Sequence, residues 1–567
     1  MVEGILFSDL FRNARLALTN RLRRLRWQRI DYVVLRMSGH YPERTVRPRR
    51  RFPLSLLPWP PPPPSIDDFA LTLERIAADP RVRGVVLIVS GLSAGSATLG
   101  SLRASILRLR QEGKQCIAYM HQLDTWSYYL ASACDEILAP ESATFRSAGL
   151  WAEAIFLKDT LALVGLEADF EAIAEYKVSP DTLRRSEMTA PHREMLESLL
   201  DSLYGEVIGA MAEGRGVTEE HIQSLLDTVP LTAVQASEAG LLDGVCYEDE
   251  LPHRLGTRET PATLVAWETA HRQLVQPSRW HSRQGIGVIS LVGTIVPGPS
   301  QRPPIPIPLP LPLPADQAGS DTLVQQLRAA ARDKRLAAIV LHVDSPGGSA
   351  FASDLIWREV ANLRRVKPVV VYMSNRAASG GYYVSAPASE IIAQATTLTG
   401  SIGIWGGKIV SRGLYDKLQA GRQSVSRGQT AGMYADTAPF SVEERAKVRA
   451  DIGTGYASFK ARVAEGRALS EDEVETVARG RVWTGEQALD HGLVDSLGDL
   501  RDAADRARHL AGLSPRRHAP LLDVLAPKRY FLAQSSPDER GAWLDGLRSL
   551  LREGVYALAP WSIRFRG

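Results

Sequence analysis

A serine set among small residues follows a strand-like run in the C-terminal half of the chain. Ser379 stands in Ala-Ser-Gly-Gly over residues 378–381, shortly after the apolar run 369–372. A strand that enters a tight turn of small residues and then a helix can present a hydroxyl at the bend, beside free backbone N–H groups. A serine nucleophile requires this arrangement. Ser379 is therefore the candidate nucleophile, and because no histidine lies close to it in sequence, its general base has to come from elsewhere.

A second glycine-rich turn lies one strand and one helix earlier. Asp-Ser-Pro-Gly-Gly-Ser over residues 344–349 follows the buried strand expected over 337–343. The two glycines allow a carbonyl group to approach the backbone closely. A glycine pair after a strand is by itself more often a tight turn, but its pairing with the serine turn favours a functional interpretation. We predict that N–H groups of Gly347, Gly348 and Gly380 stabilise the oxyanion of a tetrahedral intermediate.

The histidines of the chain are weak candidates for the missing base. His342 lies in the strand expected over 337–343, where its apolar neighbours indicate a packed side chain. His121, His192 and His491 fall on expected surface or helix-end segments, and none has a serine in a turn beside it. We therefore expect no Ser-His-Asp triad. No H-E-x-x-H motif, paired histidine or carboxylate cluster in the sequence suggests a metal, so we expect neither a metal site nor a cofactor.

Lysine is rare in this chain and is the remaining candidate base. Only ten of the 67 basic residues are lysine. Lys177, in Glu-Tyr-Lys-Val-Ser-Pro over residues 175–180, follows a mixed segment. A solvated side chain is the ordinary interpretation of any single lysine. To act as a general base, Lys177 would need a pKa lowered from ~10.4 to ~7–8, which burial away from water can achieve.

The body of the chain repeats itself once, at an offset near 254 residues. Each half has a helix, a buried strand, a glycine- and serine-rich turn, another helix and a second strand. Tyr-Tyr-Leu-Ala-Ser at 128–132 corresponds to Tyr-Tyr-Val-Ser-Ala at 382–386. Alternating strands and helices predict an α/β architecture with parallel pairing. Thr125 stands where the second half has Ser379, so the first half lacks the nucleophile turn.

Length and composition limit the classes of function. With 567 residues the chain is too long to fold around one ordinary hydrophobic core, so two or more domains are expected. The net charge of +3 gives no support to a role with nucleic acid. No stretch reaches the ~18 uninterrupted apolar residues of a spanning helix, and the N-terminus has no short apolar core with a small-residue cleavage site.

The first 51 residues are rich in arginine. They carry thirteen arginines, no lysine and four acidic residues, with apolar residues between them at roughly helical spacing. One interpretation is a basic amphipathic helix that lies on anionic lipid. The other is a surface helix packed on its own domain.

Two proline tracts punctuate the chain. Residues 58–64 are typical of a stiff polyproline linker. Residues 303–314 alternate proline with isoleucine and leucine, which excludes a sheet ladder and predicts an extended loop. That loop is either a plain linker or a contact with a membrane, a partner subunit or a hydrophobic substrate.

Four segments of the second half together resemble the signal-peptide peptidase A, or protease IV, family of serine peptidases. They are Ala378 to Tyr383, Asp344 to Ser349, Leu398 to Gly403 and Val482 to Gly485. In the first half the resemblance rests on residues 128–132, Tyr176-Lys177 and parts of 185–194. The resemblance covers about residues 66–510, in the long, duplicated form of the family.

The resemblance implies a Ser–Lys dyad shared between the halves. By position, Ser379 attacks the scissile carbonyl and Lys177 takes its proton, while Ser401 hydrogen-bonds and orients the lysine. Backbone N–H groups of Gly380 and of the Gly347-Gly348 turn form the oxyanion hole. The implied fold is a tandem duplication of ClpP/crotonase-like β-α superhelix domains, assembled as a homotetramer. The implied substrates are cleaved signal peptides and other hydrophobic or unfolded peptides.

We therefore expect a serine endopeptidase that is peripheral to a membrane, on its cytoplasmic side. Two alternatives are a crotonase-like acyl-CoA enzyme, which would need neither Ser379 nor Lys177, and a catalytically inactive membrane-associated scaffold. The predicted boundaries are a basic arm over 1–57, a proline-rich linker over 58–65, a base-carrying half over 66–255, a linker over 256–284, a nucleophile-carrying half over 285–511 and a tail over 512–567.

Overall fold

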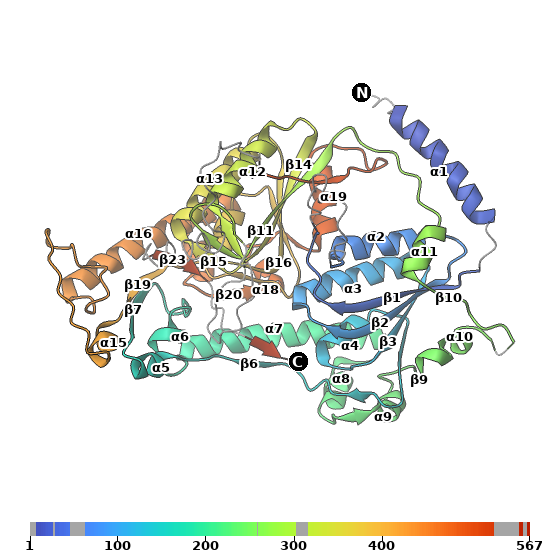
Figure 1. Cartoon of the computed structure of the whole chain (residues 1–567), viewed down its shortest axis with the longest axis horizontal. Helices are drawn as coiled ribbons and strands as arrows, with labels where there is room; N and C mark the ends of the chain where they lie inside the picture. The colour runs from blue at the N-terminus through green and yellow to red at the C-terminus, as the bar shows by residue number, and fades with distance from the viewer. Residues whose placement is uncertain are drawn as a thin grey trace.

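The computed structural model describes residues 7–25, 29–45, 63–257, 259–301, 316–526, 555–558 and 564–566. Two α/β halves lie side by side, each built around its own largely parallel sheet (Figure 1). The first half is drawn in blue to green and the second in yellow to orange. The predicted α/β class is therefore confirmed.

The first half has an all-parallel sheet in the order β10-β1-β2-β3-β4-β9. Its β2 strand contains the run 85–89, in which every residue is buried. Such a continuous apolar run is typical of a parallel strand covered on both faces. Val85 and Leu87 face the core beneath α2 and α3, and Val86 and Ile88 face the opposite layer near α10. The strands of this sheet are β1 (Tyr32–Gly39), β2 (Gly84–Leu92), β3 (Gln115–Met120), β4 (Glu136–Ala139), β9 (Gly244–Val245) and β10 (Leu264–Ala266).

The helices of the first half are α2 (Ile66–Ala77), α3 (Ser96–Gln111), α4 (Thr125–Ala131), α5 (Lys158–Leu163), α6 (Asp181–Arg184), α7 (Ala190–Arg215), α8 (Glu219–Leu226), α9 (Ala233–Glu238), α10 (Leu251–Arg254) and α11 (Trp267–Gln273). Three short strands complete it: β5 (Thr144–Phe145), β6 (Trp151–Glu153) and β8 (Leu231–Thr232).

The second half repeats this plan around the order β20-β18-β16-β14-β11-β22, and off this path β17 pairs with β16 and β21 pairs with β17. Its strands are β11 (Gly285–Val292), β14 (Leu336–Ser345), β16 (Val369–Ala378), β17 (Glu390–Ala393), β18 (Leu398–Gly400), β20 (Val482–Thr484), β21 (Ser496–Leu497) and β22 (Leu521–Asp523). Its helices are α12 (Ser320–Arg332), α13 (Ala350–Arg364), α14 (Gly380–Ser385), α15 (Arg412–Lys417), α16 (Val442–Arg467), α17 (Glu471–Val477), α18 (Gly485–Asp490) and α19 (Leu500–Leu510).

A third sheet joins the two halves, in the order β13-β12-β15-β23-β19-β7. Strand β7 belongs to the first half, yet all six of its residues pair antiparallel with β19 of the second half. The first half therefore extends one strand into its neighbour. The strands of this sheet are β7 (Glu167–Ala172), β12 (Thr294–Val296), β13 (Gln317–Gly319), β15 (Gly347–Ser349), β19 (Trp405–Val410) and β23 (Val555–Leu558).

The same contacts recur in both halves, which confirms the predicted duplication. Helices α7 and α16 both have 26 residues and end in an arginine. Arg215 forms a bidentate ion pair with Asp243 at 2.8 Å for both bonds. Arg467 forms the equivalent pair with Asp495 at 2.9 and 2.6 Å. Each pair fixes the last turn of a long helix to the segment that closes its half.

Three segments that the sequence assigned to an arm, a linker and a tail contribute strands to these sheets. Residues 32–39 form β1 inside the first sheet, 264–266 form its edge strand β10, and 521–523 form β22 beside β11. The reason for the difference is that a short apolar run gains a partner only from the folded sheet, which local composition does not reveal. The proline tract at 303–314 and most of the tract at 58–64 lie outside the described residues.

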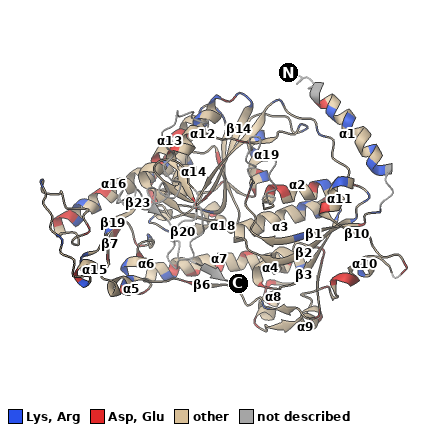
Figure 2. Ribbon diagram, in the orientation of Figure 1, with Lys and Arg blue, Asp and Glu red and all other residues tan. Residues whose placement is uncertain are grey.

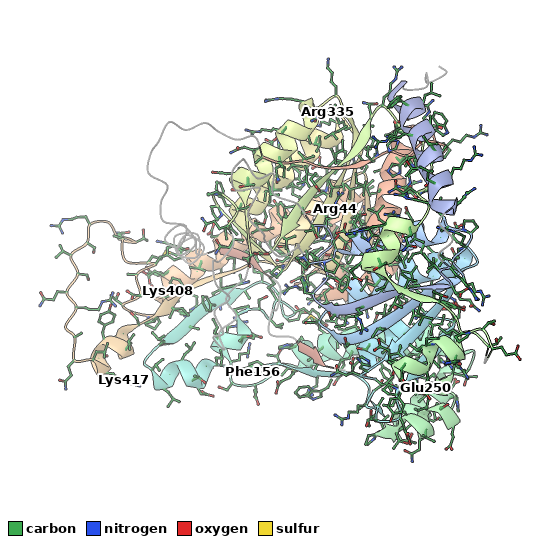
Figure 3. All side chains as sticks on the ribbon, turned by 45° about the vertical axis from the view of Figure 1, so that its right-hand side comes forward. Arg44, Phe156, Glu250, Arg335, Lys408 and Lys417 are labelled. Carbon is green, nitrogen blue, oxygen red and sulfur yellow. The ribbon has the colours of Figure 1, made fainter. Side chains whose placement is uncertain are left out.

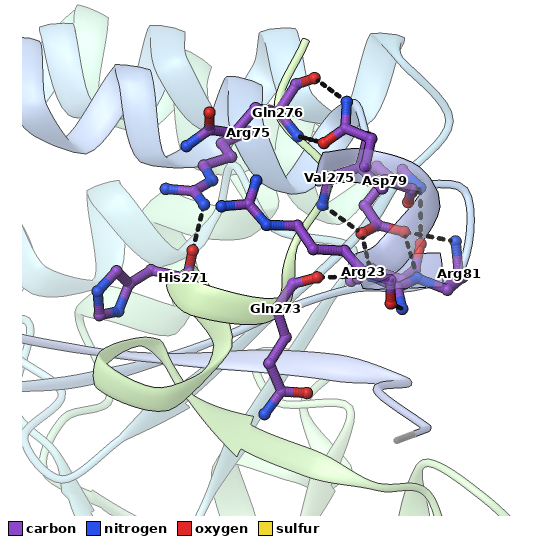
Figure 4. A network of polar contacts seen from close by, with 11 residues as sticks. Arg23, Arg75, Asp79, Arg81, His271, Gln273, Val275 and Gln276 are labelled. Atoms are coloured by element: carbon purple, nitrogen blue, oxygen red, sulfur yellow. Dashed lines mark hydrogen bonds and ion pairs between the residues drawn. The ribbon is translucent and has the colours of Figure 1, made fainter. Parts of the chain in front are cut away.

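Helix α1 (Phe7–Leu25) docks through polar groups on the segment that connects the halves (Figure 4). The side chain of Asn20 exchanges two hydrogen bonds with the backbone of Gln276, at 2.8 and 3.0 Å. Arg81 is paired with the buried carboxylate of Asp79 at 2.7 Å and also donates to the Arg23 carbonyl at 3.3 Å. The helix thus packs on its own domain through these contacts.

The opposite side of α1 leaves large apolar side chains in solvent. Phe11, Leu18 and Leu22 are 77%, 63% and 57% exposed. Basic residues lie along the same helix (Figure 2). Within the described ranges, no helix is both long and apolar enough to cross a membrane.

The two halves also meet at the end of the molecule that is farthest from α1. Lys417, at the end of α15, lies there with Lys408 of β19 (Figure 3). Lys417 Nζ donates to the backbone carbonyl of Leu163, at the end of α5. This contact fixes the α15 segment of the second half to the helix that precedes β7.

Candidate active site

Ser379 stands at a strained bend between β16 and α14. Its backbone has φ 56° and ψ −113°, in the region that side chains with a Cβ rarely adopt. Such a conformation costs about 1–2 kcal/mol and persists only when the surroundings enforce it. The enforcing bonds run from the Ser379 N–H to the Gly400 carbonyl and from the Tyr383 N–H to the Ser379 carbonyl, both at 2.8 Å. Ser379 thus lies at the bend between a strand and a helix, the local structure that the sequence predicted for this segment.

Lys177 meets Ser379 at this bend. Lys177 Nζ lies 2.7 Å from Ser379 Oγ, 2.9 Å from the carbonyl oxygen of Ser401 and 3.0 Å from Ser401 Oγ. Lys177 is 1% exposed, and both serines are completely buried. The structure thus brings together three residues that the sequence named, from two halves of the chain.

The pairing of β7 with β19 positions the lysine. After β7, the Ile173 N–H donates to the Ile404 carbonyl at 3.0 Å, and the Tyr176 N–H donates to the Arg479 carbonyl at 3.2 Å. These bonds attach the segment before Lys177 to the second half on two sides. The buried lysine of one half is therefore held by the backbone of the other.

Burial controls the protonation of Lys177. Removal of the ammonium group from water lowers the pKa of Lys177 well below its ordinary value of 10.5. The neutral amine has two N–H donors and one lone pair. As an ammonium ion, Lys177 donates to Ser379 Oγ and to both oxygens of Ser401. As the neutral amine, it can donate to the two oxygens of Ser401 and accept the proton of Ser379 Oγ.

Gly480 is a residue of this site that the sequence analysis missed. It has φ +82°, and a Cβ at this position would lie 2.5 Å from the backbone nitrogen of Lys177. The absence of a side chain therefore allows the second half to approach the lysine. Neighbouring bonds fix the loop, from Gly480 N–H to the Ile402 carbonyl at 2.8 Å and from Ser401 N–H to the Arg481 carbonyl at 2.7 Å. The glycine alone gave no signal, because its partner is a backbone 303 residues away in sequence.

The predicted oxyanion turn forms strand β15. Gly347 has φ 99°, and its N–H donates to Ser345 Oγ at 3.1 Å. A Cβ on Gly348 would lie 2.0 Å from the Ile295 carbonyl, so only glycine fits there. Gly380 is the first residue of α14, directly after Ser379. Because the Gly347 N–H is directed at a side chain, Gly348 and Gly380 are the better candidates for donors to an oxyanion.

His342, in strand β14, is a buried core residue with a hydrogen-bonded ring. His342 Nε2 lies 3.0 Å from Ser374 Oγ, and burial lowers the pKa of His342 to about 4. In the first half, Thr125 begins α4 with an ordinary cap from Asp124 and hydrogen-bonds the Gly149 carbonyl at 3.3 Å. The strained bend of Ser379 has no counterpart at Thr125.

Both halves of the chain are similar in sequence to known serine peptidases. Residues 108–259 and 361–514, one segment in each half, match the model of Peptidase family S49. The chain is 31% identical over 475 residues to the chloroplastic serine protease SPPA of Arabidopsis thaliana, which covers 82% of this chain and 68% of that protein. It is 29% identical over 461 residues to Protease 4 of Haemophilus influenzae, with 78% and 72% covered.

Two further matches are shorter. A candidate signal peptide peptidase SppA of Enterococcus faecium is 34% identical over 191 residues, which is 34% of this chain and 56% of that protein. A solved structure of a ClpP1 mutant from Listeria monocytogenes covers 33% of this chain and 86% of its own, at 15% identity and a TM-score of 0.22.

Proposed function

Because the chain belongs to peptidase family S49, we propose that it cleaves peptide bonds with a Ser–Lys dyad formed by Ser379 and Lys177. The observation that carries the proposal is the 2.7 Å contact between Lys177 Nζ and Ser379 Oγ, where both side chains are buried. A serine is a weak nucleophile unless an adjacent base takes its proton. A buried lysine with a lowered pKa is such a base.

The proposed reaction has two acyl-transfer steps. Ser379 Oγ attacks the scissile carbonyl while its proton passes to Lys177 Nζ. The C–N bond then breaks, and Lys177 returns the proton to the leaving amine. A water molecule attacks the ester that remains on Ser379, with Lys177 again taking and returning the proton.

Gly348 and Gly380 are the proposed oxyanion donors. Backbone N–H groups aimed at the developing negative charge contribute a large share of catalysis in such sites. Gly347 allows the turn its left-handed backbone, with φ 99°. Ser401 is the proposed positioning residue, because its carbonyl and hydroxyl oxygens both accept hydrogen bonds from Lys177.

The proposed substrates are hydrophobic or unfolded peptides, including cleaved signal peptides. The resemblance of the site motifs to signal-peptide peptidase A supports this class, as does the name of the Enterococcus faecium relative. We propose that the protein acts at a membrane surface. The exposed apolar residues Phe11, Leu18 and Leu22 on the arginine-rich helix α1 support peripheral contact with anionic lipid.

A homotetramer is the proposed assembly. Its support is the family resemblance, and the measurement that tests it is the mass of the purified protein by light scattering coupled to size-exclusion chromatography. A mass equal to one chain of 62.1 kDa would overturn it.

The decisive experiment compares cleavage of casein and of a synthetic signal peptide by the wild type and by Ser379→Ala and Lys177→Ala. Both variants should lose at least about a thousandfold in kcat/KM. Lys114→Ala is the matched control, because Lys114 is partly buried in the first half and donates to the Asp79 and Val82 carbonyls, at 2.8 and 2.6 Å, away from the site. Activity that survives Lys177→Ala would exclude the dyad.

Covalent labelling distinguishes the peptidase from an acyl-CoA enzyme or an inactive scaffold. A fluorophosphonate should form one adduct on the wild type, located at Ser379 by peptide mass spectrometry. The Ser379→Ala variant should form none at that peptide. A wild type that remains unlabelled and inactive on both substrates would exclude the peptidase.

A further inference from the structure

A strand from the C-terminal end of the chain lies beside the candidate oxyanion turn. Strand β23 (Val555–Leu558), red in Figure 1, is inserted between β15 and β19. It runs antiparallel to both neighbours. Gly347, Gly348 and Ser349 pair with Leu558, Ala557 and Tyr556.

The two neighbours of β23 are the elements that carry the proposed chemistry. β15 holds the glycines of the oxyanion turn, and Gly348 itself is the partner of Ala557. β19 follows Ser401 closely in sequence and pairs on its far side with β7, the strand that leads to Lys177. A backbone in the place of β23 therefore lies between the oxyanion turn and the elements that support the base.

This place is suited to an extended peptide. Without β23, β15 and β19 would each present an open edge of backbone N–H and C=O groups, and an added strand would pair with both. The segment Val-Tyr-Ala-Leu-Ala-Pro over residues 555–560 carries no charge. Its composition matches the hydrophobic peptides that the proposed function assigns as substrates.

A second pairing anchors the same end of the chain. Strand β24 (Arg564–Arg566) pairs antiparallel with β6 (Trp151–Glu153) of the first half. Two short strands of one tail are thus attached to different halves. A tethered segment acts at an effective concentration of about millimolar, so even weak pairing of β23 would compete with free peptides.

We propose that residues 555–558 are an intramolecular occupant of the substrate cleft, which peptide substrates must displace. The inference rests on the proposed function, since it identifies the β15–β19 gap as the place where the scissile peptide binds. An occupant of this kind raises KM and leaves kcat unchanged, because it competes only with binding.

Kinetics of a fluorogenic apolar peptide test the proposal. A chain that ends at residue 526 retains β22 and lacks β23, and its KM should fall by about twofold to tenfold at constant kcat. In the full chain, Ala557→Pro should have the same effect, because proline removes an N–H group from the ladder. Ser562→Pro, between β23 and β24, is the matched control and should keep the wild-type KM. Equal KM values for all four proteins, with the tails of the three full-length chains intact by mass, would overturn the proposal.

Hydrogen exchange gives a readout that does not depend on activity. In the Ser379→Ala background, removal of the tail should speed exchange of the amides at 347–349 and 405–406, and unchanged rates would overturn the proposal. Intact mass shows whether the wild type keeps its tail. Loss of residues near 557 that depends on Ser379 would itself place the tail in the cleft. A failure of the proposed function would appear separately, as peptidase activity in Ser379→Ala.

Discussion

Lys177 Nζ lies 2.7 Å from Ser379 Oγ across 202 positions of sequence, and the two residues come from different halves of a duplicated chain. Neither half contains both groups. The duplication therefore permits a division of roles, in which one copy keeps the strained serine bend and the other supplies an amine through β7. The pairing of β7 with β19 makes the site dependent on the folding of both copies.

The first prediction concerns the pH dependence of catalysis. Lys177 accepts a proton only as the neutral amine, and its pKa is lowered well below 10.5 by burial. The value of kcat/KM should therefore rise with pH through this lowered pKa and reach its plateau well below 10.5. Lys177→Arg should be inactive at every pH, because a guanidinium remains protonated. An acid limb that appears only near the ordinary lysine pKa would contradict the assignment.

The same shift predicts how stability responds to pH. Between the lowered folded pKa and the unfolded pKa of ~10.4, the unfolded chain binds a proton at Lys177 that the folded chain has released. Lys177 therefore lowers the free energy of unfolding at every pH below ~10.4. The cost shrinks as pH rises from the lowered folded pKa toward that value. The melting temperature of Lys177→Met relative to wild type should therefore decrease steadily as pH rises over this window. Lys447→Met, at an exposed position, is the control; an equally steep trend there would sink the interpretation.

Ser401 is predicted to position the base rather than to react. Ser401→Ala removes one acceptor of the Lys177 amine and leaves the Ser401 carbonyl, so kcat should fall by roughly tenfold to a hundredfold. The acid limb of the pH profile should move to lower pH, because the lost acceptor favoured the ammonium form. Ser401→Thr should restore most of the rate. A lower rate with an unshifted pH profile would indicate a purely structural role.

Local motifs explain why part of the site could be predicted from sequence. The Ser379 bend and the Gly347-Gly348 turn each follow an expected strand within a few residues. The short motif together with that strand was therefore enough to select them as candidates. Lys177 has no such local pattern, and its identification depended on the family resemblance. Its surroundings depend on long-range pairing.

The strands found in the predicted arm, linker and tail also depend on long-range pairing. Strand β1 (Tyr32–Gly39) lies in an arginine-rich stretch and gains its partners only from β2 and β10. Gly480 belongs to the candidate site only because the backbone of Lys177 approaches it. Contacts of this kind are set by the tertiary fold and leave no periodicity in the sequence.

Gly480 offers a test of that close approach. Gly480→Ala would place a Cβ 2.5 Å from the Lys177 nitrogen, so the lysine segment must move and kcat should fall by roughly a hundredfold. Gly492→Ala is the matched control, since Gly492 also has positive φ, +68°, but no atom within 4 Å of the added Cβ. It should cost only about 1 kcal/mol of stability and leave kcat unchanged. Equal kcat values for the two variants would show that Gly480 does not support the base.

The last prediction concerns α1 at a lipid surface. Deletion of residues 1–51 would also remove β1 from the central sheet, so the test is confined to the exposed face of the helix. A triple variant with serine at Phe11, Leu18 and Leu22 removes the apolar side chains and keeps the polar contacts of Asn20 with Gln276.

Binding of this variant to vesicles that contain phosphatidylserine should weaken by roughly tenfold or more, since apolar area and positive charge both contribute to interfacial binding. Rising salt should weaken the wild type further, because screening reduces the arginine contribution. The control carries serine at three exposed apolar positions elsewhere, Leu163, Leu418 and Val425. Co-sedimentation of the α1 variant equal to that of the control would contradict lipid binding by this face.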